Sequence, residues 1–264
     1  MTTLWRFALA AALLYAGVVA ALALTQTALI FPRWAMSGAE SRLPSDTRRL
    51  QVDRPGGVTL HGMDLPGPRD DLPVILGFGG NAWPADALAN YLRAALPDHR
   101  IVVFHYRGYG PSSGRPSARA LAEDALAIHD HLQARNVVAV GLSLGSGPAA
   151  HLAARRDLAG LVLVTPFDSL TNLAQGHYPW APVRLLLRHR MEVARDLEGV
   201  QAPVALIAAG SDTIIPAQRT APLREVASNL VLDRTIPGAG HNTLYEHPDF
   251  VPTLRAAVAR MIPP

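Results

Sequence analysis

The first strong pattern in the chain is an uninterrupted apolar segment near its start. Residues 7–24 carry no charged side chain, and the apolar character returns at residues 28–31. About 20 apolar helical residues span the core of a bilayer, whereas the apolar part of a secretory signal has only about 7 to 15. We therefore expect a hydrophobic anchor over residues 1–32, with a transmembrane helix at about residues 5–25. A cleaved signal peptide is the alternative, because Ala21-Leu22-Ala23 is a suitable cleavage site.

Charges on the two sides of this segment bear on its orientation. Arg6 and the terminal amine precede it, and Arg33 and Arg42 follow it. These charges nearly balance under the positive-inside rule. We expect a single-pass membrane protein, with a slight preference for a domain on the periplasmic, or extracytoplasmic, side.

Beyond the anchor, short apolar runs alternate with helical patterns. Residues 50–53 and 58–65 flank a Pro-Gly-Gly turn, which predicts an antiparallel hairpin. Six further runs follow, and most of them are short and apolar without polar alternation, which is typical of parallel strands that are covered on both faces. These runs are residues 74–76, 101–105, 137–140, 161–164, 204–208 and 230–236.

Apolar residues at helical spacing fall between several of these strands. Leu88, Leu92 and Leu96 share one helix face, and a second helix over residues 121–132 is preceded by Ser117, a suitable N-cap. The alternation predicts an α/β domain over residues 33–264, with a mostly parallel twisted sheet and helices on both faces. In the interval of about 169–199 a helix at residues 183–189 occurs without a strand, and we expect a small cap there.

Composition narrows the chemistry. The chain has no cysteine, which excludes disulfides, thiolate zinc sites, iron–sulfur clusters and cysteine nucleophiles. All of its basic residues are arginines, scattered singly or in pairs, and the net charge is only +3. Nucleic-acid binding usually requires denser basic clusters, so no nucleic-acid partner is expected. The dinucleotide and zinc-protease motifs are also missing, and we expect no cofactor and no metal.

The strongest chemical signal is Gly-Leu-Ser-Leu-Gly at residues 141–145. It follows an apolar strand and precedes a helical segment, the setting of a nucleophile elbow. In such an elbow, glycines on either side of the serine avoid collisions within a tight strand-to-helix turn. Ser143 is therefore the expected nucleophile.

A serine nucleophile needs a base and an acid that come later in the chain. His241 follows the last strand in a glycine-rich loop and is the expected base, with His247 as its nearest rival. Asp212 follows the strand at residues 204–208, which gives the order Ser, Asp, His. Asp168, at the end of another strand, is the alternative acid.

The same chemistry requires hydrogen-bond donors for an oxyanion. One expected donor is the backbone amide of Leu144, directly after the nucleophile. The other is the amide of Asn81, in the glycine-rich loop that follows the strand at residues 74–76, with Gly80 as the alternative.

Taken together, several motifs make the chain resemble the α/β-hydrolase fold, and more narrowly its membrane-anchored Bem46-like or ABHD13/ABHD17-like branch. The motifs are Gly80-Asn81-Ala82, Tyr106-Arg107-Gly108-Tyr109-Gly110, Gly141-Leu142-Ser143-Leu144-Gly145, Gly210-Ser211-Asp212 and Gly240-His241-Asn242. The apolar N-terminus and the Leu-Ile-Phe-Pro that follows it are similar to the anchor of that branch. The chain departs from the pattern at Gly79, where many relatives carry histidine.

This resemblance implies a serine hydrolase that uses Ser143, Asp212 and His241 on an ester, thioester or lipid-like substrate. We expect an esterase or thioesterase bound to the membrane through its N-terminal helix. A serine peptidase or amidase, an acyltransferase on the same triad, and a non-catalytic binding scaffold are the alternatives. The motifs indicate no particular oligomeric state or acyl-chain length.

Overall fold

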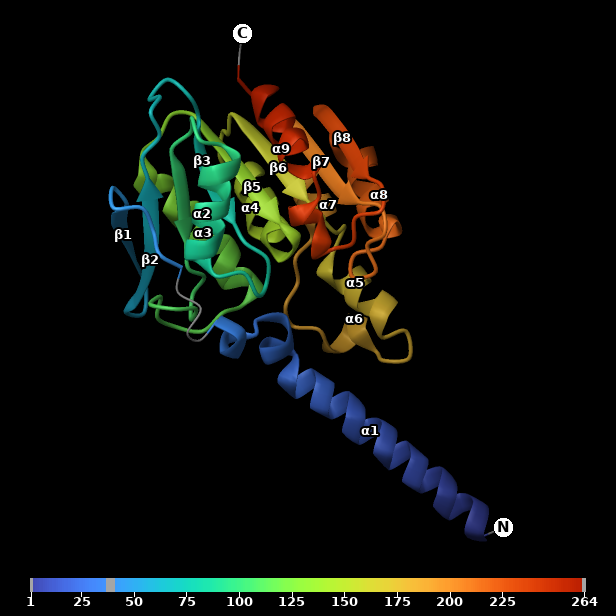
Figure 1. Cartoon of the computed structure of the whole chain (residues 1–264). Coiled ribbons are helices and arrows are strands. Elements are labelled where there is room, and N and C mark those ends of the chain that lie inside the picture. Colours follow the sequence, from blue (N-terminus) through green and yellow to red (C-terminus); the bar gives the residue numbers. More distant parts are fainter. Residues whose placement is uncertain (1, 37–40, 263–264) are drawn as a thin grey trace.

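The computed structural model describes residues 2–36 and 41–262, and its centre is an eight-stranded sheet (Figure 1). The strand order is β1-β2-β4-β3-β5-β6-β7-β8. The strands are β1 (Arg48–Arg54), β2 (Val58–Leu65), β3 (Val74–Phe78), β4 (Ile101–Phe104), β5 (Val137–Leu142), β6 (Gly160–Val164), β7 (Val204–Ala209) and β8 (Leu230–Ile236). Every predicted strand is therefore present, and the predicted α/β fold class is confirmed.

The pairing of the strands follows the sequence pattern. β1 and β2 form the antiparallel hairpin, with Arg54 opposite Val58. Gly56 and Gly57 have φ of 80° and 70° in the turn, a backbone conformation that side chains other than glycine rarely adopt. β2 is antiparallel to β4, and all later pairs are parallel. The carboxyl ends of β3 to β8 consequently lie at one edge of the sheet.

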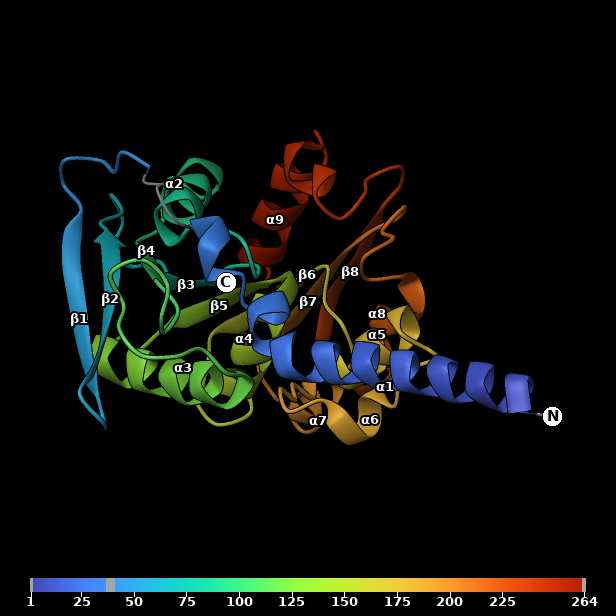
Figure 2. The ribbon, with the colours of Figure 1, turned by 90° about the horizontal axis from the view of Figure 1, so that it is seen from below.

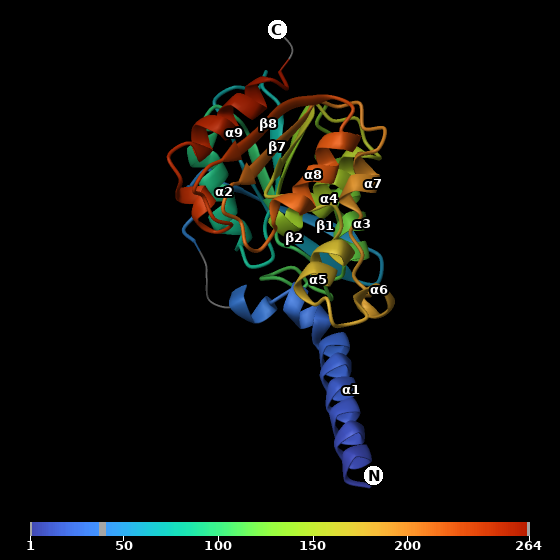
Figure 3. The same ribbon diagram turned by 90° about the vertical axis from the view of Figure 1, so that its right-hand side faces the viewer.

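Helices cover both faces of the sheet (Figures 2 and 3). The buried side chains form two apolar clusters, one on each face. On one face lie α2 (Ala85–Ala95) and α9 (Phe250–Ala259). On the other face lie α3 (Ala118–Leu132), α4 (Ser146–Ala153), α7 (Val193–Leu197) and α8 (Ala217–Val226). The strands β3 to β7 are buried on both sides, which explains their continuous apolar character.

One predicted helix needs correction. Residues 183–189 were expected to be helical, but α6 (Val183–Leu186) ends earlier and Leu187 is extended. The chain must leave the helix here because the Arg188 amide donates to the side chain of Gln26, and the His189 ring bonds Thr27. Contacts with a distant segment have therefore overridden the local helical pattern.

The apolar N-terminus forms one long helix, α1 (Thr2–Ile30). Its mean hydropathy reaches 2.4, and among the described residues it is the one helix long and apolar enough to cross a membrane. α1 projects away from the domain on the side opposite the C-terminus (Figure 1). The C-terminal part of α1 lies beside α5 (Leu170–His177) and α6 (Figure 3). Both of these short helices belong to the segment predicted as a cap.

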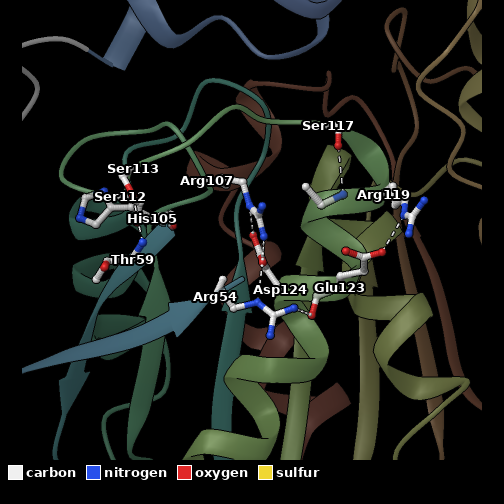
Figure 4. Close-up of polar contacts among 11 residues, drawn as sticks. Arg54, Thr59, His105, Arg107, Ser112, Ser113, Ser117, Arg119, Glu123 and Asp124 are labelled. Atoms are coloured by element: carbon white, nitrogen blue, oxygen red, sulfur yellow. Dashed lines mark hydrogen bonds and ion pairs between the residues drawn. The ribbon is translucent and has the colours of Figure 1, made fainter. Parts of the chain in front are cut away.

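A buried ion cluster braces the loop after β4 against α3 (Figure 4). The Asp124 carboxylate accepts hydrogen bonds from Arg107, with Nε to Oδ2 at 3.0 Å, and from Arg54, with Nε to Oδ1 at 3.1 Å. The Asp124 side chain is only 6% exposed, and both arginines are mostly covered. Arg107, which belongs to the Tyr106–Gly110 motif, therefore has a bracing contact away from the predicted triad.

We expect Asp124→Ala to lower the free energy of unfolding by about 3 kcal/mol, because removing one member of a buried ion cluster leaves the other charges uncompensated. Urea unfolding of the detergent-solubilised protein measures the change. Glu123→Ala is the matched control. Glu123 is the residue directly before Asp124, and its substitution breaks only an exposed ion pair with Arg119. It should have little effect. Equal effects of the two variants would contradict a stabilising role for the buried cluster.

Candidate active site

Ser143 lies at a sharp turn between β5 and α4. Its φ is +52°, in the left-handed region that residues other than glycine rarely occupy. The flanking glycines permit this turn: a Cβ on Gly141 would lie 2.6 Å from the Gly145 carbonyl oxygen, and one on Gly145 would collide with the Phe78 backbone. The predicted strand, turn and helix are all observed, and they expose the Ser143 hydroxyl at the carboxyl edge of the sheet.

His241 and Asp212 meet Ser143 at this edge. The Nε2 atom of His241 lies 3.0 Å from Ser143 Oγ, and its Nδ1 lies 2.8 Å from Asp212 Oδ2. A carboxylate only accepts hydrogen bonds, so Nδ1 carries the proton and Nε2 is left to accept from the serine hydroxyl. This arrangement can remove the hydroxyl proton as the oxygen attacks an acyl carbon.

The surroundings hold Asp212 in place. Its Oδ1 accepts the amides of Ile214 and Ile215 at 2.9 and 2.7 Å. The side chains of Asp212 and His241 are 3% and 9% exposed. Hydrogen bonds to both carboxylate oxygens fix the orientation of the Asp212 side chain, which suits a group that orients the imidazole.

The rival residues lie in other networks. Asp168 is buried, and its Oδ2 accepts from Asn172 and from Arg219, at 2.8 and 3.2 Å. The Nδ1 atom of His247 accepts the Asp249 amide at 3.2 Å. His241 lines the pocket that contains Ser143, and His247 does not. The geometry favours Asp212 and His241, and their catalytic roles stay a prediction.

The predicted oxyanion loop borders the same pocket. Gly80, Asn81 and Leu144 all line it, and a Cβ on Gly80 would lie 3.7 Å from that of Ser143. The structure adds two residues to this region. The Tyr106 hydroxyl donates to the Gly79 carbonyl at 2.7 Å, and the Tyr109 hydroxyl donates to the Asn81 carbonyl at 3.1 Å.

These tyrosines hold the carbonyl groups of the loop. Burial raises the pKa of both phenols, well above the usual value for Tyr106, so both remain protonated donors. With its carbonyls fixed, the loop cannot rotate freely, and the orientation of its amides is set. The Tyr-x-x-Tyr spacing at residues 106 and 109 was visible in the sequence, but its partners belong to another loop.

Tyr106→Phe should lower kcat about tenfold and leave KM within about twofold, because a positioning contact affects the oxyanion more than the bound substrate. Steady-state kinetics on an acyl ester separate the two constants. Ser228→Ala is the control, since it loses a 2.9 Å bond from a side-chain hydroxyl to the Val200 carbonyl, at the opposite end of the strands. A rise in KM at unchanged kcat would contradict the positioning role.

The pocket around Ser143 is a cavity of about 820 Å³ with mostly apolar walls. One wall consists of Trp83, Tyr91 and Tyr245, whose rings meet edge to face. Burial raises the pKa of Tyr245 to about 12, and the nearby Asp212 charge adds to the shift. Side chains of α5 and α6 form another wall, and α1 supplies a third. The described residues include no cluster suited to a metal ion.

Comparison with known proteins identifies the family. A family model described as "alpha/beta hydrolase fold" matches residues 73–192. An uncharacterised protein of Mycobacterium tuberculosis is 37% identical over 243 residues, which cover 88% of this chain and 85% of that protein. The chain belongs to the α/β-hydrolase fold family. This membership, with lipases and esterases among the similar proteins, supports hydrolase activity.

Two further proteins place this α/β hydrolase among its relatives. Lysophosphatidylserine lipase ABHD12 of Danio rerio is 28% identical over a region that covers 59% of this chain and 47% of that protein. A crystal structure of a bacterial membrane phospholipase A superposes with a TM-score of 0.65 at 16% identity, covering 98% of this chain and 97% of that one. At this identity the likeness establishes the shared fold. The narrower Bem46-like branch stays a prediction.

Proposed function

We propose that this α/β hydrolase is a membrane-anchored serine hydrolase that cleaves carboxylic esters or thioesters. The observation that carries the proposal is the pair of hydrogen bonds from Ser143 through His241 to Asp212, at 3.0 and 2.8 Å. The positive φ of Ser143 adds support, because it presents the hydroxyl at the carboxyl edge of the sheet.

The proposed reaction has two halves. Ser143 Oγ attacks the acyl carbon while His241 Nε2 takes its proton, and the resulting oxyanion lies near the amides of Asn81 and Leu144. His241 then returns the proton to the departing alcohol or thiol, leaving an acyl ester on Ser143. Water attacks this ester with the same proton transfers and releases the carboxylic acid. The residues named here complete the cycle without a cofactor.

The anchor is part of the proposal. We assign residues 1–32 to the anchor and residues 33–264 to the hydrolase domain, with a cap at about 169–199. Retention of α1, rather than cleavage as a signal, is supported by its contacts with the cap, including Gln26 Nε2 to the Leu186 carbonyl at 3.2 Å. We place the domain on the extracytoplasmic side.

Labelling with a fluorophosphonate tests the proposal directly. The reagent forms a covalent bond with an activated serine, so intact-mass analysis should detect one adduct on the wild-type protein, mapped to the peptide with Ser143. His241→Ala should abolish the adduct, and His247→Ala, the rival histidine, should retain it. A folded wild-type protein that forms no adduct, or one that forms it without His241, would contradict the proposed chemistry.

A further inference from the structure

One face of α1 is a wall of the cavity that contains Ser143. Val19, Leu22, Ala23, Gln26 and Ile30 line this cavity together with Ser143 and His241. Their spacing of three or four residues places them on one side of the helix. Another wall comes from the segment predicted as a cap, including Val183, Leu186 and Leu187. The cavity is therefore also a groove between the membrane helix and the cap.

Polar contacts fix the width of this groove. Gln26 is buried, with its Nε2 donating to the Leu186 carbonyl and its Oε1 accepting the Arg188 amide at 2.8 Å. Thr27 Oγ1 lies 2.7 Å from His189 Nε2. Because these bonds join α1 to the chain that leaves α6, the helix has a fixed place in the site.

The length of α1 determines how deep the groove lies. Arg6 must stay near the far surface of the bilayer, because a charged side chain is costly in hydrocarbon. Counting from Phe7, a helix needs about 20 residues to cross a core of about 30 Å, and so reaches Gln26. Val19, Leu22 and Ala23 then lie inside the hydrocarbon. A tilted helix needs more residues to cross, which places them deeper still.

The tip of the cap also lies within the hydrocarbon, at the level of Tyr15 and therefore deeper than Val19. The Tyr15 hydroxyl, midway along α1, donates to the Trp180 carbonyl at 2.9 Å, and the two rings pack edge to face. Such a hydroxyl would be unpaired if this part of α1 faced lipid alone. Outside α1, the large apolar side chains that are exposed among the described residues are Trp34, Tyr178, Trp180, Leu185 and Ile214. Three of these belong to the cap, and Leu185 is 80% exposed.

From these observations we infer that the active-site groove opens into the bilayer between α1 and the cap, and that the substrate is a membrane lipid whose acyl chain lies along α1. This inference rests on the proposed function and adds its substrate class. A chain entering from the bilayer stays in apolar surroundings, between the α1 face and the cap, until its ester reaches Ser143. α1 thus serves as part of the binding site as well as an anchor.

The position of the cap can be tested without catalysis. The chain has no cysteine, so Leu185→Cys and Asp70→Cys each create one attachment point for a bimane fluorophore. Asp70 is exposed in the loop before β3, at the opposite end of the strands. In phosphatidylcholine vesicles with nitroxide-labelled acyl chains, we expect strong quenching at position 185 and none at position 70. An unquenched fluorophore at position 185 would overturn the inference, whatever the activity.

The use of the groove can be tested with two fluorophosphonates, one with a short and one with a long alkyl chain. Leu22→Trp places a larger side chain in the groove and narrows it. We expect the ratio of long-chain to short-chain labelling rates to fall by at least about tenfold, because a poor fit in an apolar pocket changes discrimination between substrates by about that much. Leu13→Trp is the matched control, since Leu13 is 64% exposed on the opposite face of α1, about two and a half turns away, and should leave the ratio unchanged.

The outcomes separate the two proposals. An unchanged ratio in Leu22→Trp, with normal labelling by both probes, would overturn the lipid groove and leave the serine hydrolase standing. A wild-type protein that neither probe labels would contradict the proposed function itself, while the quenching experiment would still report where the cap lies.

Discussion

Replacing Ser143 by alanine should lower kcat/KM for an acyl ester by at least about 10⁴-fold. The reason is that the proposed mechanism requires an acyl bond to Ser143 Oγ, and no nearby group can substitute for that oxygen. His241 would still be held by Asp212, so the fold and the pocket should persist. Initial rates on a chromogenic acyl ester, with vesicle-reconstituted protein, measure the loss.

Ser146→Ala is the matched control for this experiment. Ser146 begins α4, three residues beyond the nucleophile, and its buried hydroxyl has no hydrogen-bond partner among the described residues. Removing that hydroxyl should leave kcat/KM within about threefold of the wild type, because it touches no reacting atom. If Ser143→Ala retained the wild-type rate, or if Ser146→Ala lost as much, the assignment of the nucleophile would be wrong.

Much of the fold could be predicted because its signals are local. The strands β3 to β7 are buried on both faces and therefore appear as continuous apolar runs. Ser117 caps α3 through its bond to the Ala120 amide. The turn at Ser143 was predictable for a similar reason, since the crowding that requires Gly141 and Gly145 arises within one strand-turn-helix unit.

Other elements lack a clear local signal. α8 contains Pro222, and its residues show little separation of apolar and polar faces. α9 contains Pro252 near its start. Proline is tolerated in the first turn of a helix but disfavoured further in, and its presence obscured both patterns. These helices are stabilised by packing of a few side chains, such as Leu223 and Leu254, against the sheet.

The contacts of the candidate site that the sequence does not specify depend on tertiary structure. Tyr106 and Tyr109 bond carbonyls of the Gly79–Asn81 loop, a partner that follows only from the parallel pairing of β3 with β4. The contribution of α1 to the cavity is still less local, because Gln26 and the Leu186 carbonyl are 160 residues apart. An apolar segment indicates a membrane helix, but its pattern contains nothing about which face meets the domain.

The identity of the acid gives the second large expected effect. Asp212→Asn should lower kcat by about 10⁴-fold, because an amide can donate to Nδ1 and so favour the wrong imidazole tautomer. In that tautomer Nε2 carries the proton and cannot accept the one from Ser143. KM should change little, since Asp212 lies behind the histidine. Steady-state kinetics on a saturating acyl ester measure both constants.

Asp168→Asn is the decisive comparison, because Asp168 is the other acid that follows a strand at this edge of the sheet. Its Oδ2 is paired with Arg219 at 3.2 Å, and its side chain is 7% exposed. The substitution should lower the free energy of unfolding, since it removes the charge that compensates a largely covered arginine, while kcat stays within about threefold. A pattern in which Asp168→Asn abolishes turnover and Asp212→Asn does not would assign the acid to Asp168. The 2.8 Å contact between Asp212 and His241 would then have no role in orienting the base.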